Sequence, residues 1–186
     1  MKLRKQVLSI LCVGMLAFVV GCTHEQAPTT GKSEPTQETK VNKDAETSKV
    51  SQEKVKMVFF VPTEDASGVK QQTVEMEANK VTPKAALLAM LNADRAQKYP
   101  VFSKDIEITS VTVKDGIASV EVNDAFVKGN GGDLTVKLQM AAIVNTLTSF
   151  DNINGVLFVN NGKKVPTVGS FDTKEPVKRM TNLIKK

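Results

Sequence analysis

Apolar residues change their spacing along the chain from Lys56 onward, and each change predicts a different element. Val58–Val61 is a continuous apolar run ended by Pro62, so we expect a buried strand over Lys56–Val61. Apolar and polar residues alternate in Gln72–Glu77, which predicts a second, half-exposed strand. The polar turn Thr63–Gly68 lies between them. The two strands should therefore pair as a hairpin.

A helix is predicted immediately after this hairpin. Thr82 can cap its first turn, and Pro83 occupies the first helical position, where the missing N–H costs nothing. We expect the helix to run to about Ala93. Its buried stripe should consist of Leu87, Leu88 and Leu91.

A second hairpin is predicted around Asp115–Gly116, because this pair suits a two-residue turn in which glycine accepts a positive φ. The turn fixes a register that places the β-branched apolar residues on one face. The expected pairs are Lys114 with Ile117, Val113 with Ala118, Val111 with Val120, and Thr109 with Val122. Ile106 and Ile108 lie out of phase with this face. The strand should therefore begin near Thr109 or carry a bulge there.

The strongest amphipathic helix is predicted over Leu134–Phe150, with Asp133 placed to cap it. Val156–Val159 follows and is apolar on both faces, as in a central strand. Asn161–Gly162 then offers a tight turn into a short strand within Lys163–Thr167.

These elements give the order β-β-α-β-β-α-β, with a short strand after it. We predict an α+β fold in which one mixed or antiparallel sheet carries two helices packed on one face. Residues 55–186 are enough for one domain of ordinary size.

The first 21 residues have the pattern of a lipoprotein signal peptide. Basic residues precede the uncharged stretch Val7–Val20, which is too short for a permanent membrane span of roughly 20 residues. Val19–Cys22 resembles the lipobox, in which a small residue precedes a cysteine that receives diacylglycerol. We therefore predict lipidation of Cys22 and a membrane anchor on the extracytoplasmic face of the cell membrane. An ordinary secretory signal with a coincidental cysteine is the alternative.

Residues 22–54 are polar and nearly free of large apolar side chains, which predicts a disordered tether. The only histidine, His24, lies in this segment. Three of the 25 basic residues precede Cys22, so the mature chain has 22 basic and 20 acidic residues. Because the two signs are interspersed, we expect no nucleic-acid partner. A small cluster at the C-terminus, Lys178, Arg179, Lys185 and Lys186, could contact anionic lipid or wall polymer.

Candidate chemistry beyond Cys22 is sparse. Gly129–Gly132 precedes a helix and could hold a phosphate, but it lacks the spacing and lysine of a P-loop. Glu75 with Glu77, and Asp94 with Asp105, are near pairs of acids that could form a hydrolytic dyad, but a solvated surface explains them better. Residues 55–186 contain no histidine or cysteine. We therefore expect no enzyme, no metal site and no cofactor.

Several segments together resemble the GerMN domain, which is named for a sporulation and germination lipoprotein. The resemblance covers nearly all of Val55–Arg179, and its most specific part is Asn145–Phe150. The other matching segments are Val58–Val61, Pro83, Leu87–Leu91, Val111–Val122, Ala142–Phe150, Val156–Val159 and Asn161–Gly162.

The resemblance implies an α+β domain, similar to ring-building modules of secretion and sporulation complexes, that acts outside the cytoplasm by protein–protein contact. We therefore expect a lipid-anchored interaction module of the cell envelope, with sporulation or spore germination as the process in which it acts. The alternative is a lipoprotein that binds cell wall or a small ligand near Gly129–Asp133. Asn145 and Thr146 are poor helix formers that either contact a partner or satisfy backbone groups nearby.

Overall fold

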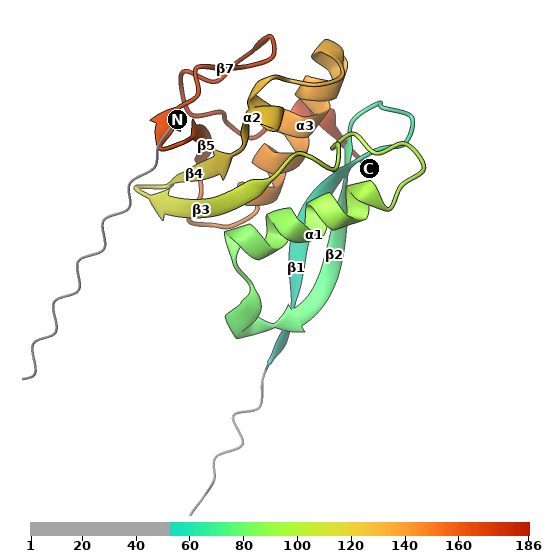
Figure 1. Ribbon diagram of the computed structural model, residues 1–186. Coiled ribbons are helices and arrows are strands. Elements are labelled where there is room, and N and C mark those ends of the chain that lie inside the picture. The colour runs from blue at the N-terminus through green and yellow to red at the C-terminus, as the bar shows by residue number, and fades with distance from the viewer. Residues whose placement is uncertain (1–52) are drawn as a thin grey trace, which may run out of the picture. The chain divides into compact units, whose positions relative to one another are not determined.

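The computed structural model describes residues 53–186, so the predicted signal, Cys22, His24 and nearly all of the predicted tether lie outside the described residues. The described residues form an α+β domain (Figure 1). In chain order the elements are β1 (Lys54–Pro62), β2 (Val69–Glu77), η1 (Ala78–Lys80), α1 (Pro83–Arg95), β3 (Ile108–Lys114), β4 (Ile117–Val122), α2 (Asp124–Val127), α3 (Gly132–Leu147), β5 (Gly155–Asn160), β6 (Lys163–Lys164), β7 (Thr167–Val168), β8 (Phe171–Asp172), η2 (Thr181–Leu183) and β9 (Ile184–Lys185).

The prediction of a single sheet is wrong. Strand pairing among the described residues gives the orders β1-β2-β9, β3-β4-β5-β6 and β7-β8. The physical reason lies at the outer edge of β1, where the Phe60 N–H donates to Thr146 Oγ1 of α3 over 2.8 Å. A helix side chain thus occupies the place where a neighbouring strand would continue the sheet.

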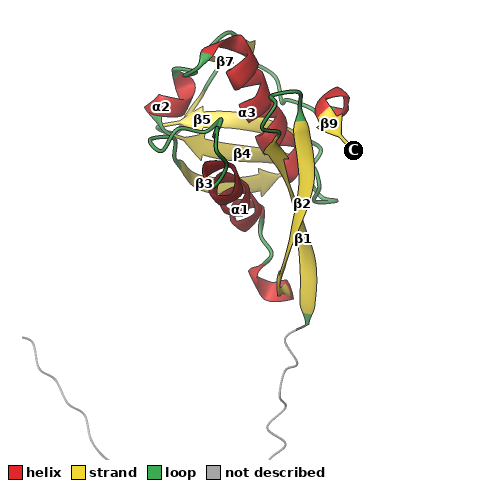
Figure 2. Ribbon diagram, turned by 90° about the vertical axis from the view of Figure 1, so that its right-hand side faces the viewer, coloured by secondary structure: helices red, strands yellow, loops and turns green. Residues whose placement is uncertain are grey.

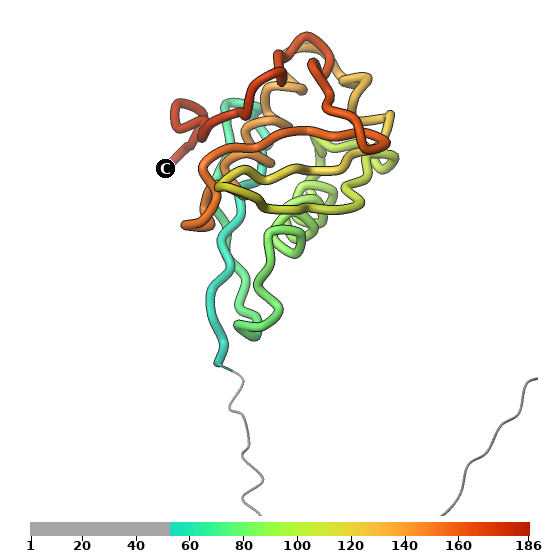
Figure 3. Tube along the Cα trace, turned by 90° about the vertical axis from the view of Figure 1, so that its left-hand side faces the viewer, coloured from blue at the N-terminus to red at the C-terminus, as the bar shows by residue number. Residues whose placement is uncertain are grey.

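The two long helices pack together and against both larger sheets. α1 contacts β1 and β3, while α3 contacts β1, α1 and β5. Figure 2 shows the β1–β2 hairpin running across the direction of β3, β4 and β5, and Figure 3 shows those three strands side by side across the opposite view. α3 is buried almost all round, including its polar Gln139, Asn145 and Thr146. It is therefore the centre of the core.

Both predicted hairpins are confirmed. β1 pairs antiparallel with β2, and β3 pairs antiparallel with β4 in the expected register from Lys114–Ile117 to Val111–Val120. Asp115 and Gly116 both have positive φ, 51° and 77°, as a type I′ turn requires. The predicted pair of Thr109 with Val122 is wrong, because Ile108 pairs with Val122 and a bulge at Thr109 shifts the register. That bulge was one of the two expected outcomes.

The helix predictions are confirmed in place and corrected in detail: α1 continues to Arg95, α3 ends at Leu147, and Leu88 of the expected buried stripe is 43% exposed. Thr82 Oγ1 accepts from the Ala85 N–H over 3.1 Å and caps α1 as expected. Gly131, not Asp133, occupies the N-cap position of α3, and the Asp133 carboxylate accepts a hydrogen bond from the Ser170 hydroxyl. The short α2 was not predicted. It forms because Asn123 caps it and Phe126 is fully buried, stacked on Phe158.

The last strands are also close to expectation. β5 is central, parallel to β4 and antiparallel to β6, and Asn161 and Gly162 form the tight turn between β5 and β6. Residues 165–185 add β7, β8 and β9, which the apolar pattern did not indicate.

Candidate interaction surface

The most specific part of the resemblance, the end of α3, is a buried junction. Asn145 is fully buried, and its side-chain amide accepts from the Met180 N–H over 2.8 Å and donates to the Met180 carbonyl over 3.2 Å. The amide thus pairs with the backbone as a strand would. Together with the bond from Phe60 to Thr146, it connects α3 to β1 and to the C-terminal segment. Asn145 and Thr146 therefore satisfy backbone groups of distant segments.

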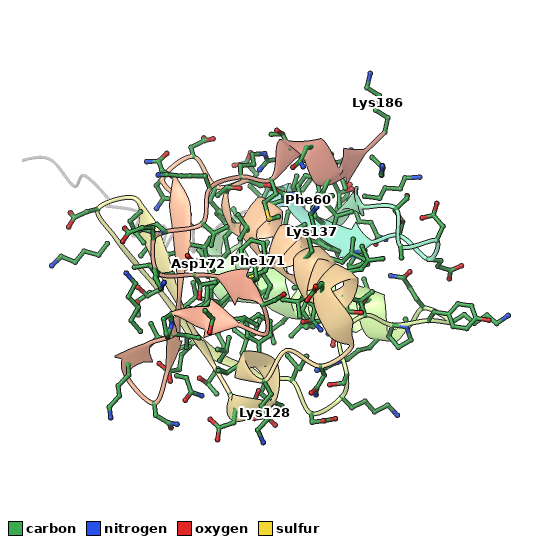
Figure 4. All side chains as sticks on the ribbon, turned by 90° about the horizontal axis from the view of Figure 1, so that it is seen from above. Phe60, Lys128, Lys137, Phe171, Asp172 and Lys186 are labelled. Atoms are coloured by element: carbon green, nitrogen blue, oxygen red, sulfur yellow. The ribbon has the colours of Figure 1, made fainter. Side chains whose placement is uncertain are left out.

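Arg179 belongs to the same junction, so the expected basic cluster at the C-terminus is divided. Its guanidinium donates to the Asn145 carbonyl and to Thr148 Oγ1, both over 3.1 Å, and lies 5.1 Å from the centre of the Phe60 ring. Burial lowers the pKa of Arg179 from its ordinary value. In Figure 4, Phe60 lies within the domain, whereas Lys128 and Lys186 extend outward on opposite sides.

The glycine-rich loop also has a structural explanation. Gly129 has φ +66°, and a Cβ there would lie 2.5 Å from Cα of Gly169. Two backbone segments therefore pass closer at this point than any side chain permits. Pockets of about 230 to 570 Å³ lie elsewhere on the described domain, and none of them is lined by Gly129–Asp133.

Asp94, a member of one candidate acid pair, has a structural role. Asp94 is fully buried and accepts from the N–H groups of Val101 and Phe102, over 3.2 and 2.8 Å. Burial raises the pKa of its carboxyl, against these two hydrogen bonds and the nearby Arg95 charge. Asp105 is exposed on the loop between α1 and β3. Asp94 therefore holds the loop that follows α1.

In the other pair, Glu77 forms an ion pair of 2.9 Å with Lys80. Within residues 53–186, no group of three or more acidic, histidine or cysteine side chains could hold a metal ion. None of the helices in this part of the chain has the length and apolar character needed to span a membrane.

Open strand edges of the described domain include that of β2 beyond Lys70 and that of β3. The Thr63 N–H bonds to the Gly68 carbonyl, which fixes which pairs of the β1–β2 ladder are hydrogen-bonded. Because hydrogen-bonded and non-hydrogen-bonded pairs alternate along an antiparallel ladder, the N–H and C=O groups of Thr73 and Glu75 point away from β1. β9 pairs with β2 only at Val69 and Lys70, so the edge beyond is uncovered by the described residues. Lys70–Glu75 is exposed, and Figure 1 shows the β1–β2 hairpin extending past α1 and α3.

The second open edge belongs to β3, the first strand of the four-stranded sheet. In a two-residue hairpin the residues that flank the turn form a hydrogen-bonded pair, here Lys114 with Ile117. Hydrogen-bonded pairs recur at every second residue, so the backbone of Thr112 also bonds to β4. Val111 and Val113 therefore direct their N–H and C=O groups away from β4. Within the described chain no strand covers them.

Sequence reasoning did not find these edges. Alternation along Gln72–Glu77 indicated a strand, but no pattern shows which strands lack a neighbour. The only signal is the polar composition of β2, whose residues from Lys70 to Glu75 are exposed on both faces.

Comparisons with known proteins place this domain in a family. A comparison with curated proteins finds no match. The first GerMN domain of the sporulation protein GerM from Bacillus subtilis is 20% identical, covers 67% of this chain and 98% of its own, and superposes with a TM-score of 0.52. The tandem GerMN domains of the same protein are 19% identical over 71% of this chain and 47% of theirs, with a TM-score of 0.51.

A third solved structure, of a candidate lipoprotein from Clostridium perfringens, is 21% identical over 70% of this chain and 91% of its own, with a TM-score of 0.47. The two GerM structures show that the fold is that of a GerMN domain. The Germane family model, described as "Sporulation and spore germination", matches residues 57–166. The expected resemblance is confirmed, and the chain belongs to the Germane family of GerMN-domain proteins.

Proposed function

We propose that this protein is a lipid-anchored, extracytoplasmic protein-interaction module of the bacterial cell envelope that acts in sporulation or spore germination. The family description supports the process. The observation that carries the interaction role is the open outer edge of β2. Exposed strand edges pair readily with other chains, and natural proteins usually block them. An edge left open at the end of a projecting hairpin fits the addition of a partner strand.

The β2 edge is equipped for such an addition. Thr73 and Glu75 present outward N–H and C=O groups, which supply main-chain affinity. Val74, between them, is 39% exposed and offers an apolar contact for a partner side chain. The proposed role involves binding and no catalytic step.

Partner capture tests this role. Full-length protein crosslinked in growing and in sporulating cells should recover a protein partner. Thr73→Pro removes an N–H that points away from β1, so β1–β2 pairing persists while the outer edge is blocked. We expect Thr73→Pro to abolish partner recovery and Thr73→Ala, which keeps the N–H, to retain it. Equal recovery by both variants would exclude the β2 edge. Recovery of no protein, together with saturable binding to cell wall, would favour the alternative of a wall-binding lipoprotein.

The anchor is tested separately at Cys22, the residue proposed to carry the lipid. Cys22→Ala should abolish incorporation of labelled palmitate and release the protein from the membrane fraction. Cys12→Ala is the matched control, because Cys12 lies in the predicted signal and leaves with it. Incorporation of label into the Cys22→Ala variant would show that the lipid is attached elsewhere.

A further inference from the structure

We propose that the free edge of β3 is a self-association site, at which β3 pairs antiparallel with β3 of a second copy of this chain. The inference goes beyond the proposed function, since it concerns a different edge and a different partner. It rests on three observations: the outward backbone groups of β3, the side chains on its two faces, and the charges at its two ends.

The backbone groups of β3 are self-complementary. Val111 and Val113 present both N–H and C=O outward, and Thr112 lies between them. A two-fold axis at Thr112 places Val111 opposite Val113 of the second copy, and Val113 opposite Val111 of that copy. Each opposition is a hydrogen-bonded pair, so the contact contains four backbone hydrogen bonds. If the axis moved to Val111 or to Val113 instead, the hydrogen-bonded pairs would include Thr109 in the bulge or Asp115 in the turn.

The side chains of β3 agree with this register. Val111 and Val113 lie on the same face of the sheet as Ala118 and Val120 of β4. The two β4 residues are buried, whereas Val113 is 36% exposed. Pairing sets Val111 against Val113 of the second copy and extends this apolar face across the axis. On the other face Thr112 meets Thr112 of the second copy, which is a favourable cross-strand pair.

Charges at the ends of β3 are complementary in the same register. Lys114 of the second copy lies opposite Ser110, and Ser110 is opposite Glu121 on β4. Lys114 and Glu121 are then two strand spacings apart, about 10 Å between Cβ atoms, and both can reach over the small serine. Asp115 of the second copy lies opposite Thr109, whose carbonyl accepts from Lys84 Nζ over 2.6 Å. Each end of the contact thus brings an acid towards a lysine.

The contact is short, so we expect weak association in solution and stronger association on a membrane. Confinement by a lipid anchor raises the effective concentration of one copy near another. The edge is also partly protected, since the bulge lies at Thr109 and Lys84 donates to the Thr109 carbonyl. The covered part ends at Thr109, before the residues that the two-fold pairing uses.

Site-specific oxidation tests the pairing. In the full-length lipoprotein with Cys22 acylated, Thr112→Cys introduces a single free thiol at the proposed axis. The two thiols then occupy a non-hydrogen-bonded pair, with Cβ atoms close enough for a disulfide. Mild oxidation of membranes should shift most of the Thr112→Cys protein to twice its monomer mass. Ser110→Cys, on the same face, should remain monomeric, because its two copies lie about 13 Å apart along the strands.

Two further variants separate pairing from random collision. Val113→Pro removes an outward N–H without touching β3–β4 pairing, and should abolish the disulfide of Thr112→Cys while thermal unfolding shows a folded domain. Lys114→Glu should reduce the disulfide by placing two acids together, and the swap Lys114→Glu with Glu121→Lys should restore it. Equal dimer from Ser110→Cys and Thr112→Cys, or none from Thr112→Cys, would overturn the proposal.

The result is independent of the β2 edge and of the anchor. Absence of the Thr112→Cys dimer alongside recovery of a partner through β2 would reject self-association alone. If Cys22 does not anchor the protein, the same oxidation is done on purified Cys22→Ser protein at high concentration. Dimer formation there supports the pairing even where the proposed function fails.

Discussion

Replacement of Asn145 by leucine should lower the free energy of unfolding by about 2 to 4 kcal/mol, since it leaves the Met180 N–H and carbonyl without their partners. Leucine has the same number of side-chain heavy atoms and the same branching as asparagine, and a higher helix propensity, so neither a cavity nor the helix accounts for the loss. Urea unfolding of wild type and variant measures it. In addition, the Met180 amide should exchange its hydrogen faster, because the C-terminal segment is released from α3.

Ser149→Ala is the matched control at the same helix end. The Ser149 hydroxyl donates to the Asn145 carbonyl over 2.8 Å, and its loss leaves that carbonyl with the Arg179 hydrogen bond. We expect a loss of about 1 kcal/mol or less. If Asn145→Leu unfolds at the same urea concentration as wild type, the amide does not connect α3 to the C-terminal segment.

The local elements could be predicted because their causes are local. The turn at Asp115–Gly116 requires positive φ at two successive residues, so the sequence determines the β3–β4 register up to the bulge. Thr82 and Pro83 likewise define the start of α1. In each case the residues that decide the structure are neighbours in the chain.

The division into sheets could not be predicted, because its cause joins residues 86 positions apart. Thr146 accepts from the Phe60 N–H and ends the sheet at β1, and a threonine within a helix gives no indication of that partner. Asn145 and Met180 are 35 positions apart and present the same difficulty. Asp133 was expected to cap α3 because of its position, but Gly131 begins the helix and Ser170 binds the carboxylate.

The candidate surface was missed for a related reason. An open edge is defined by the absence of a neighbour, and local patterns describe only the strand itself. For β3, the alternation from Val111 to Val113 indicated a buried face on one side. Which of the strand's two edges is covered depends on the order of all strands in the sheet, which only the assembled fold contains.

Gly129→Ala should cost about 2 to 5 kcal/mol of unfolding free energy. A Cβ at this position would lie 2.5 Å from Cα and 2.7 Å from N of Gly169, so the two backbone segments must move apart. The positive φ of +66° adds about 1 to 2 kcal/mol for any residue with a Cβ. Thermal or urea unfolding of the variant measures the sum.

Gly132→Ala separates the two contributions. Gly132 also has a positive φ, +81°, but a Cβ there would meet nothing within 4 Å. Its variant should lose only the conformational contribution of about 1 to 2 kcal/mol. The difference between the two variants then measures the close approach of Gly129 to Gly169. Equal losses would mean that this approach is relaxed in solution, and the loop would regain the freedom that a ligand site near Gly129–Asp133 requires. A larger loss for Gly129→Ala identifies the loop as a packed junction between α2, α3 and the β7–β8 hairpin, which leaves the strand edges as the surface available to partners.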